Sequence, residues 1–297
     1  MRSTNIRRRE FIAAALAVAA GRGLAGPPER ILLAAARGTD TAGSARSAID
    51  ALGGIGSFVA PGQQVMILPN PQGRQRGAST SPELVEEVVR LCLKAQAAKV
   101  RVCSIHSGSR WKGTGIDDAA LRAGAEFWRP ASASDWRTVE VKGARRQKEV
   151  RVVAPVLESD VVINMPVAKQ HGSTRFTGTL KNLMGVNDGN AGWHQGTAYL
   201  VDSIVDLASA VKAHLCVVDC TEMLAENGPF GPGRTVKPNT VVAGIDPVAV
   251  DAYACTLLGM QAADVSTIAQ AAERGLGTVR IEEAAGGGAV KKFRASD

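Results

Sequence analysis

The sequence predicts an α/β fold with mostly parallel sheets and flanking helices. Valine-rich runs alternate with helical patterns along the 297 residues, glycine is abundant, and aromatic residues make up only 4%. This combination favours an α/β protein over an all-β sandwich. A chain of this length can bury a substantial core as one large or two modest domains. Two lobes around a cleft are therefore an open alternative.

The first half of the chain is expected to contain a right-handed βαβ unit. Ser81 and Pro82 have the residue types of a helix N-cap and first turn, and His106 follows the second strand at its carboxyl end. The expected elements are helix 45–57, strand 65–68, helix 81–97, strand 99–105 and helix 117–125.

The second half continues the alternation of strands and helices. Asp246 is expected to cap the last helix. The basic residues at 142–148 are interpreted as a solvated hairpin tip, with an anion-binding patch as the alternative. The expected elements are a hairpin at 138–141 and 149–153, strand 160–164, helix 199–213, strand 215–219, strand 240–245 and helix 247–258. Residues 278–297 are expected to be a C-terminal tail with a short final strand.

Residues 1–25 have the pattern of a twin-arginine export signal. Arg8 and Arg9 precede an apolar run at 12–20, and small residues at 23–25 suit cleavage before Gly26. No other segment approaches the roughly 18 apolar residues of a transmembrane helix. The mature protein is thus expected to be periplasmic, exported folded, with no integral membrane segment. Residues 26–44 are expected to form a mobile lead-in to the domain at 45–277.

Charge and cysteine usage exclude two classes of function. The chain is formally +7, but residues 1–25 contain five arginines and one glutamate, so the mature chain is only about +3. Binding to nucleic acid therefore loses its main support. The five cysteines lack Cys-x-x-Cys spacing, so a ferredoxin-type cluster in this chain is not expected. We interpret them as small buried hydrophobic residues.

Residues 158–189 contain the strongest functional signal. An apolar strand at 160–165 leads into a polar, glycine-containing segment, and ligands of open α/β sheets bind where parallel strands end. Fixed cations and an imidazole at this point suit a small anionic substrate or a metal-bearing cofactor. A solvated basic loop is the alternative. The candidate binding residues are Lys169, Arg175, Lys181 and Asn182, with His171 as a candidate acid or base.

Two further features bear on this cleft. Residues 177–179 can open a short helix whose free N–H groups favour negative charge, which makes Lys181 an anion-binding or cofactor-anchoring candidate. Asp219 follows the apolar residues 215–218 of the expected strand. Its carboxylate is expected to bind a divalent cation or to hold the cationic loop in place.

Six blocks of the sequence follow one another in a recognisable order: 65–70, 159–166, 169–171, 177–185, 227–229 and 246–252. On these blocks the chain resembles the bacterial domain-of-unknown-function 362 family, across about residues 45–277. This family has no settled reaction. The chain lacks the ferredoxin cysteines that many members append, and Leu68 stands where the family usually has lysine.

The order of His106, His171, Lys181 and His194 is similar, more distantly, to that in nickel-pincer lactate racemases. That resemblance implies that His106 and His171 move a proton, that Lys181 anchors an organic cofactor, and that His194 binds a transition metal, nickel or iron. A histidine can act as acid and base near neutral pH, and a lysine in a dry cationic pocket is nucleophilic.

Three classes of function follow from these observations. The first is an exported isomerase- or racemase-like enzyme that acts on a small carboxylate with a metal or a Lys-anchored cofactor. The second is a periplasmic module that binds or delivers a metal or an anionic ligand without turnover. The third is a maturation factor for a partner enzyme. Proton exchange on a bound substrate would distinguish the first class from the other two.

Overall fold

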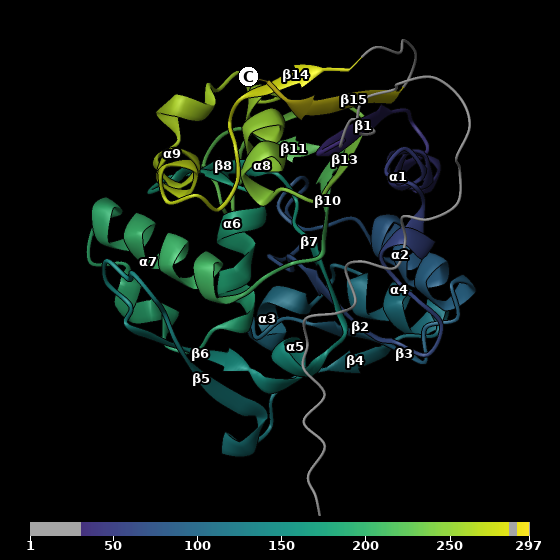
Figure 1. Cartoon of the computed structure of the whole chain (residues 1–297), viewed down its shortest axis with the longest axis horizontal. Helices are drawn as coiled ribbons and strands as arrows, with labels where there is room; N and C mark the ends of the chain where they lie inside the picture. Colours follow the sequence, from purple (N-terminus) through teal and green to yellow (C-terminus); the bar gives the residue numbers. More distant parts are fainter. Residues whose placement is uncertain (1–30, 285–289, 297) are drawn as a thin grey trace, which may run out of the picture.

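The computed structural model describes residues 31–284 and 290–296, and it confirms the α/β prediction. One nine-stranded sheet in the order β14-β15-β1-β13-β10-β7-β2-β3-β4 runs through this part of the chain (Figure 1). The sheet is continuous across the described residues. Its strands are β1 (Leu33–Arg37), β2 (Gln64–Pro69), β3 (Lys99–Cys103), β4 (Glu126–Trp128), β7 (Val161–Met165), β10 (Leu215–Cys220), β13 (Thr240–Gly244), β14 (Ile281–Glu283) and β15 (Val290–Ala295).

Strands β10, β7, β2, β3 and β4 are parallel, whereas β13, β1, β15 and β14 join through antiparallel pairs. The predicted βαβ unit is present as β2, α2 and β3. Because the parallel strands share a direction, the segments that follow β2, β3, β7 and β10 emerge at one edge of the sheet. The candidate residues of the sequence therefore meet at that edge.

The sheet is covered by helices on both faces. Val65 and Ile67 of β2 pack with one group of helices, and the intervening Met66 and Leu68 pack with the other, because successive strand side chains point to opposite faces. The first group is α1 (Thr41–Asp50), α2 (Pro82–Lys94) and α4 (Ile116–Ala123). The second is α6 (Thr179–Asn182), α7 (Thr197–Ala210), α8 (Pro247–Thr256) and α9 (Ser266–Glu273).

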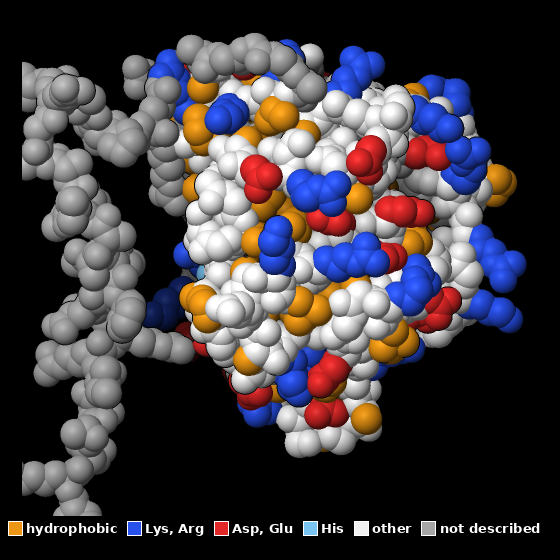
Figure 2. All heavy atoms as spheres, turned by 90° about the vertical axis from the view of Figure 1, so that its right-hand side faces the viewer, with side chains coloured by type: hydrophobic (Ala, Val, Ile, Leu, Met, Phe, Trp, Pro, Cys, Tyr) orange, Lys and Arg blue, Asp and Glu red, His pale blue; other side chains and the backbone are white. Residues whose placement is uncertain are grey.

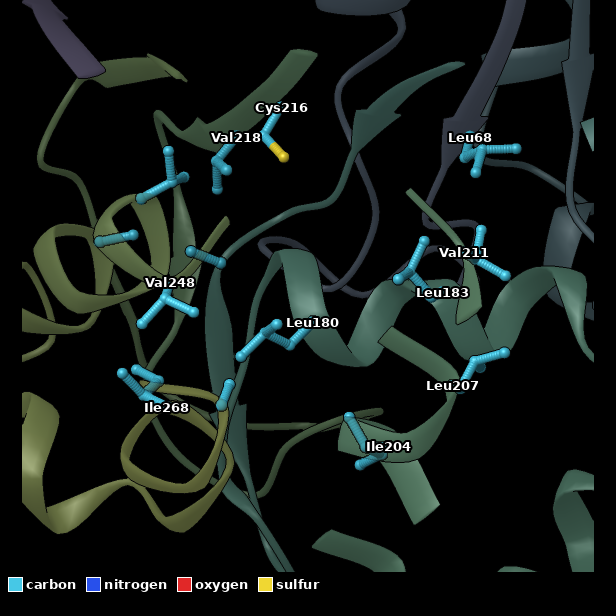
Figure 3. Packing of buried hydrophobic residues seen from close by; sticks show 14 of the residues in the cluster. Leu68, Leu180, Leu183, Ile204, Leu207, Val211, Cys216, Val218, Val248 and Ile268 are labelled. Carbon is cyan, nitrogen blue, oxygen red and sulfur yellow. The ribbon is translucent and has the colours of Figure 1, made fainter. Parts of the chain in front are cut away.

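Figure 3 shows the core on the second face. Leu180 of α6 and Leu183 lie between residues of α7 and α8 and the sheet residues Cys216 and Val218. All five cysteines are buried and unpaired, as the sequence analysis expected. Burial raises the pKa of the Cys103 thiol to about 12, so this group packs as a hydrophobic residue.

The two ends of the domain differ from the sequence prediction. Residues 33–37, expected within a lead-in, form β1 between β13 and β15. The expected tail contributes both β14 and β15 to the sheet. Strand β1 reads Leu-Ala-Ala-Ala-Arg and has no β-branched or aromatic residue, so its local preference for a strand is weak. Its neighbours supply the pairing. The proposed signal at 1–25 lies outside the described residues.

The surface carries interspersed charges of both signs. Figure 2 shows basic and acidic side chains mixed over the side of the molecule on which α1, α2 and α4 lie. Ion pairs of these helices join Arg46 with Glu87, and Glu86 with Arg90 and Arg122. Among the described residues on this face, the two signs of charge alternate and do not form the single-sign patch that is typical of nucleic-acid binding. No helix in the described part of the chain is both long and apolar enough to cross a bilayer.

The predicted hairpin forms as β5 (Trp136–Glu140) and β6 (Glu149–Val153). The basic segment at its tip is fastened to α7. The carboxylate of Asp206 accepts hydrogen bonds from the backbone N–H groups of Arg145, Arg146 and Gln147 at 3.0, 2.8 and 2.8 Å. Asp202 pairs with Arg146. The carboxylates of α7 thus bind the basic segment and hold the tip of the hairpin in place.

Candidate functional site

A cavity of about 320 Å³ lies at the carboxyl edge of the parallel strands. The residues that line it come from four parts of the chain: the segments after β2 and β3, the segment 169–194, and the loop at 226–233. They are Asn70, Gln72, Ile105, His106, Arg110, Lys169, His171, Thr177, Lys181, Asn182, Met184, Gly185, Asn190, His194, Pro229 and Phe230. Six of the eight candidate residues from the sequence are among them.

A short hairpin after β7 forms one wall of the cavity. The sequence analysis expected a loop here, but β8 (Lys169–His171) pairs with β9 (Arg175–Thr177), and Lys169 lies directly opposite Thr177. Lys169 is 1% exposed. Its Nζ donates a 2.7 Å hydrogen bond to Asn70 Oδ1 and another to the Ala78 carbonyl. Burial, and then the nearby Lys181 and Arg110, lower the pKa of this ammonium well below its usual value.

Buried asparagines connect Lys169 to the strand ends. Asn70 Nδ2 donates to Asn182 Oδ1, and Asn182 Nδ2 donates to both the Leu68 carbonyl and Asn164 Oδ1, each at 2.8 Å. Asn164 Nδ2 in turn donates to the Thr179 carbonyl at 2.8 Å. The network ties β2, β7 and α6 together and satisfies polar groups that would be costly to bury alone. Asn182 is thus part of the framework as well as of the lining.

His106 is held by two side chains. Its Nδ1 lies 2.6 Å from Ser104 Oγ and its Nε2 lies 2.6 Å from Gln72 Nε2. Because an amide nitrogen donates, Nε2 is the acceptor and Nδ1 carries the ring proton in this arrangement. Burial, with repulsion from Lys169, Arg110, Arg129 and Lys181, lowers the pKa of His106 to about 4. The ring is neutral at pH 7, so it can accept a proton.

His171 has the opposite tautomer. Its Nδ1 accepts hydrogen bonds from the backbone N–H groups of Ser173 and Thr174 at 3.1 and 3.3 Å. Nε2 therefore carries the proton of the neutral ring and remains available as a donor. Burial, with repulsion from Lys181, Lys169 and His194, lowers the pKa of His171 to about 3. His171 suits hydrogen-bond donation to an anion.

Lys181 lies in the short helix α6. Its Nζ is 3.5 Å from Met184 Sδ, and burial lowers its pKa to about 8. The helix N–H groups expected to attract a ligand are already occupied, because Asp251 of α8 accepts from Thr179 N at 2.6 Å and from Leu180 N at 3.1 Å. A Cβ at Gly178 would lie 2.3 Å from Asp251 Oδ1. This part of the prediction is wrong: α6 is capped by the chain's own carboxylate.

The remaining candidates have different positions. His194 lines the cavity, with Nδ1 3.1 Å from the Asn190 carbonyl. Arg175 lies at the tip of the β8–β9 hairpin and does not line it. Asp219 is also outside: its carboxylate accepts from Ser81 N at 2.7 Å and from Thr221 N at 3.0 Å. The grouping of Asp219 with His194 as metal ligands is therefore corrected. Asp219 fastens the start of α2.

The other ten lining residues were not among the candidates from the sequence, and four of them bear on ligand binding: Gln72, Arg110, Thr177 and Phe230. Thr177 Oγ1 and Gln72 Oε1 are buried without a hydrogen-bond partner among the described residues. The guanidinium of Arg110 stacks on the ring of Phe230, with Cζ 3.6 Å from the ring centroid. Arg110 could have been predicted, because it belongs to the same segment after β3 as His106. The partner, Phe230, is 120 positions away.

The cavity is cationic. Arg110, Lys169 and Lys181 line it together with three histidines, and its lining includes no aspartate or glutamate. In the described part of the chain, no group of three or more His, Cys, Asp or Glu side chains is arranged to hold a metal ion. The arrangement therefore favours a negatively charged ligand, because an anion would relieve the repulsion among the buried cations.

Comparison with protein-family models identifies the family of this chain. The model of the family described as domain of unknown function DUF362 matches residues 65–256. A relative named thylakoid-associated protein, from Synechocystis sp., is 28% identical over 258 residues, which cover 80% of this chain and 76% of the relative.

Two solved structures are also similar. A protein from Thermotoga maritima has a TM-score of 0.43 and 11% identity, with 80% of this chain and 60% of the other covered. The lactate racemase apoprotein from Thermoanaerobacterium thermosaccharolyticum has a TM-score of 0.48 and 13% identity, with 81% and 59% covered. The chain thus spans about three fifths of each of these structures. By its sequence, the chain belongs to the domain-of-unknown-function 362 family.

Proposed function

We propose that the cavity binds a small carboxylate and that His106 and His171 act on it as proton acceptor and hydrogen-bond donor. The observation that supports this most directly is the charge of the lining, which has three basic side chains and no acidic one. Buried positive charges are poorly solvated by the protein alone, so an anion that binds beside them is strongly favoured. A volume of about 320 Å³ suits a small molecule.

The two histidines have complementary roles in this proposal. His171 Nε2–H donates to the carboxylate and helps to orient it, since its Nδ1 is occupied by backbone N–H groups. His106 Nε2 has its lone pair directed at Gln72. A ligand that displaces the Gln72 amide meets this lone pair, and its negative charge beside the ring raises the basicity of the imidazole. The imidazole then takes a proton from the carbon next to the carboxylate. The electron pair of the broken C–H bond is delocalised into the carboxylate as an enediolate, which the basic side chains of the lining stabilise, and return of a proton or deuteron to the carbon completes the exchange. The Nδ1 contact with Ser104 keeps the ring in the required tautomer.

A Lys-anchored cofactor with a transition metal is compatible with two of the lining residues. In the described part of the chain, the polar contact of Lys181 Nζ is with the thioether of Met184 at 3.5 Å, and a lysine with its pKa lowered to about 8 is a competent nucleophile. His194 would supply an imidazole to the metal. Such a group would supply an electron-accepting ring to the reaction. Mass analysis of the Lys181 peptide and metal analysis of the protein from its native host test this part, with Lys181→Ala and His194→Ala as the controls.

The experiment for the carboxylate function combines binding and exchange. Calorimetric titration with acetate, propionate and lactate should detect binding, and ¹H NMR in D₂O should detect loss of the C2 proton signal. His106→Gln should abolish exchange and retain binding, whereas His171→Gln should weaken binding. His214→Asn is the matched control, because His214 lies outside the cavity and accepts from Val162 N. Binding without exchange favours the delivery module, and absence of binding by all three probes contradicts the proposal.

Export is part of the proposed function. It depends on the pattern of Arg8 and Arg9 ahead of the apolar run at 12–20, and it would place the carboxylate chemistry in the periplasm. A maturation role for a partner enzyme remains the alternative, and a stable complex recovered from the native host would favour it.

A further inference from the structure

Arg110 has an unusual environment for a partly buried arginine. It belongs to the short helix α3 (Gly108–Trp111) and lines the cavity. One face of its guanidinium lies on the ring of Phe230, with Cζ 3.6 Å from the ring centroid. Among the described residues, no side-chain or backbone oxygen accepts a hydrogen bond from the guanidinium N–H groups of Arg110. The stacked plane therefore leaves the donor-bearing edges available for an oxyanion, which guanidinium binds in bidentate fashion.

Phe230 is held in place although it is 45% exposed. Its loop is fastened to β8 through Gly228, whose N–H donates to Gln170 Oε1 at 2.6 Å and whose carbonyl accepts from Gly172 N at 3.2 Å. A Cβ at Gly228 would lie 1.8 Å from the Gln170 carbonyl oxygen. The close approach of residue 228 to Gln170 therefore requires glycine. It fixes the position of the Phe230 ring, the platform on which the Arg110 guanidinium stacks. An exposed aromatic fixed in this way orients the guanidinium at the mouth of the cavity.

A second set of unsatisfied donors lies deeper. Lys169 Nζ has three donors when charged, of which two bond to Asn70 and Ala78. Thr177, its cross-strand partner, is 3% exposed and its Oγ1 has no partner in the described residues. Both side chains line the cavity. The buried wall thus has an amine and a hydroxyl without enough protein acceptors, separately from the guanidinium at the mouth.

We propose that the ligand carries two anionic groups, one bound at the buried wall by Lys169 and Thr177 and the other at the mouth by Arg110. This inference rests on the proposed binding of small carboxylates and narrows it to a class of dianions. One carboxylate would neutralise at most one of the three lining cations. The cavity volume of about 320 Å³ lies at the lower end of the range of ligand pockets in proteins, which suits a short dicarboxylate.

The experiment compares dicarboxylates with monocarboxylates. Calorimetric titration of the full chain at constant ionic strength uses malonate and succinate against acetate and propionate. A bidentate charge-assisted contact predicts that one dicarboxylate binds about tenfold or more tightly than either monocarboxylate. Arg110→Gln should remove this preference and leave acetate affinity within about threefold. Lys112→Gln is the matched control, because it removes a charge from an exposed residue next to α3 that does not line the cavity.

Gly228→Ala is the second variant. It keeps every charged residue but displaces the platform, so it should weaken dicarboxylate binding in the same direction as Arg110→Gln. Equal affinity for the two ligand classes, with acetate still bound, would overturn the dianion inference and leave the carboxylate site standing. Equal losses for acetate and malonate in Arg110→Gln would also overturn it, since Arg110 would then belong to a single-anion site. If none of the four probes binds, the proposed function fails as well.

Discussion

The carboxylate of Asp251 accepts a 2.6 Å hydrogen bond from the backbone N–H of Thr179, so α8 supplies the negative charge at the start of α6. The next N–H, of Leu180, donates to the same carboxylate. Lys181 and Asn182 follow directly in this short helix. A buried carboxylate outside the cavity thus positions two of its lining residues.

Asp251→Asn should change the pH dependence of stability. Burial raises the pKa of Asp251 to about 6, from 3.8, in spite of its hydrogen bonds. Between these values the folded state binds more protons than the unfolded state, so the free energy of unfolding falls as pH rises. The contribution of this group amounts to roughly 3 kcal/mol at most. Denaturant unfolding at pH 4, 5, 6 and 7 should give a wild-type minus variant difference that declines with pH. A constant difference would contradict the assignment.

Lys181 should set an upper pH limit for ligand binding. Burial lowers the pKa of its ammonium to about 8, so the free protein loses this charge as pH rises through that value. Affinity for acetate should therefore fall between pH 7 and 9. Lys181→Arg keeps the charge over this range, and in this variant calorimetric affinities should no longer show the decline. A decline of the same size in Lys181→Arg would assign it to another group.

Thr177→Val should separate binding from stability. The substitution removes a buried hydroxyl that has no partner among the described residues and nearly preserves shape. Urea unfolding should thus show equal or higher stability, by about 1 kcal/mol. Affinity for malonate should drop by roughly 3- to 10-fold, because the hydroxyl no longer donates to the ligand. Loss of stability with unchanged affinity would mean that the hydroxyl has a structural partner.

Asn182→Leu should destabilise the protein through the amide network. The variant leaves Asn70 Nδ2, Asn164 Oδ1 and the Leu68 carbonyl without the partner that Asn182 provides. Unsatisfied buried groups of this kind predict a loss of about 2–4 kcal/mol in urea unfolding. Asn190→Ala is the comparison: Asn190 also lines the cavity, and the substitution removes its bonds to Met184 O and Asn187 O. A loss below about 1 kcal/mol in Asn182→Leu would contradict the network.

Replacing Arg8 and Arg9 by lysine tests export. The twin-arginine pattern predicts that this variant accumulates as precursor in the cytoplasm, because both arginines belong to the signal. Cell fractionation with immunoblotting against the mature chain gives the measurement, and wild-type protein in the same strain is the control. Normal periplasmic yield of the double-lysine variant would show that another route exports the chain.

The position of the cavity was predictable, because it depends on local patterns. The apolar run of β7 and the βαβ unit from β2 to β3 determine a common strand edge, and His106, His171 and Lys181 follow from it. Strand β1 was not predictable, since its alanines carry little strand preference and its neighbours come from distant parts of the chain.

Individual partners were harder to infer than the edge. Asp219 is the penultimate residue of β10, one position before the end of the strand, and its oxygens accept hydrogen bonds from Ser81 and Thr221. Arg110 and Phe230 are 120 positions apart in the sequence and are in contact in the folded structure. The spacing of residues along the sequence does not reveal such tertiary contacts. It therefore predicts where a site lies better than it predicts which residues form the site.

The asparagine network has a consequence for how the protein responds to its surroundings. Primary amides neither gain nor lose protons in the range where imidazoles and amines titrate. Asn70, Asn164 and Asn182 therefore keep the same hydrogen bonds while the charge of the side chains facing the cavity changes. A change in pH would therefore alter the electrostatic potential in the cavity while the hydrogen-bonded framework around it stays the same. Ligand affinity can thus depend on pH without a change in the shape of the cavity.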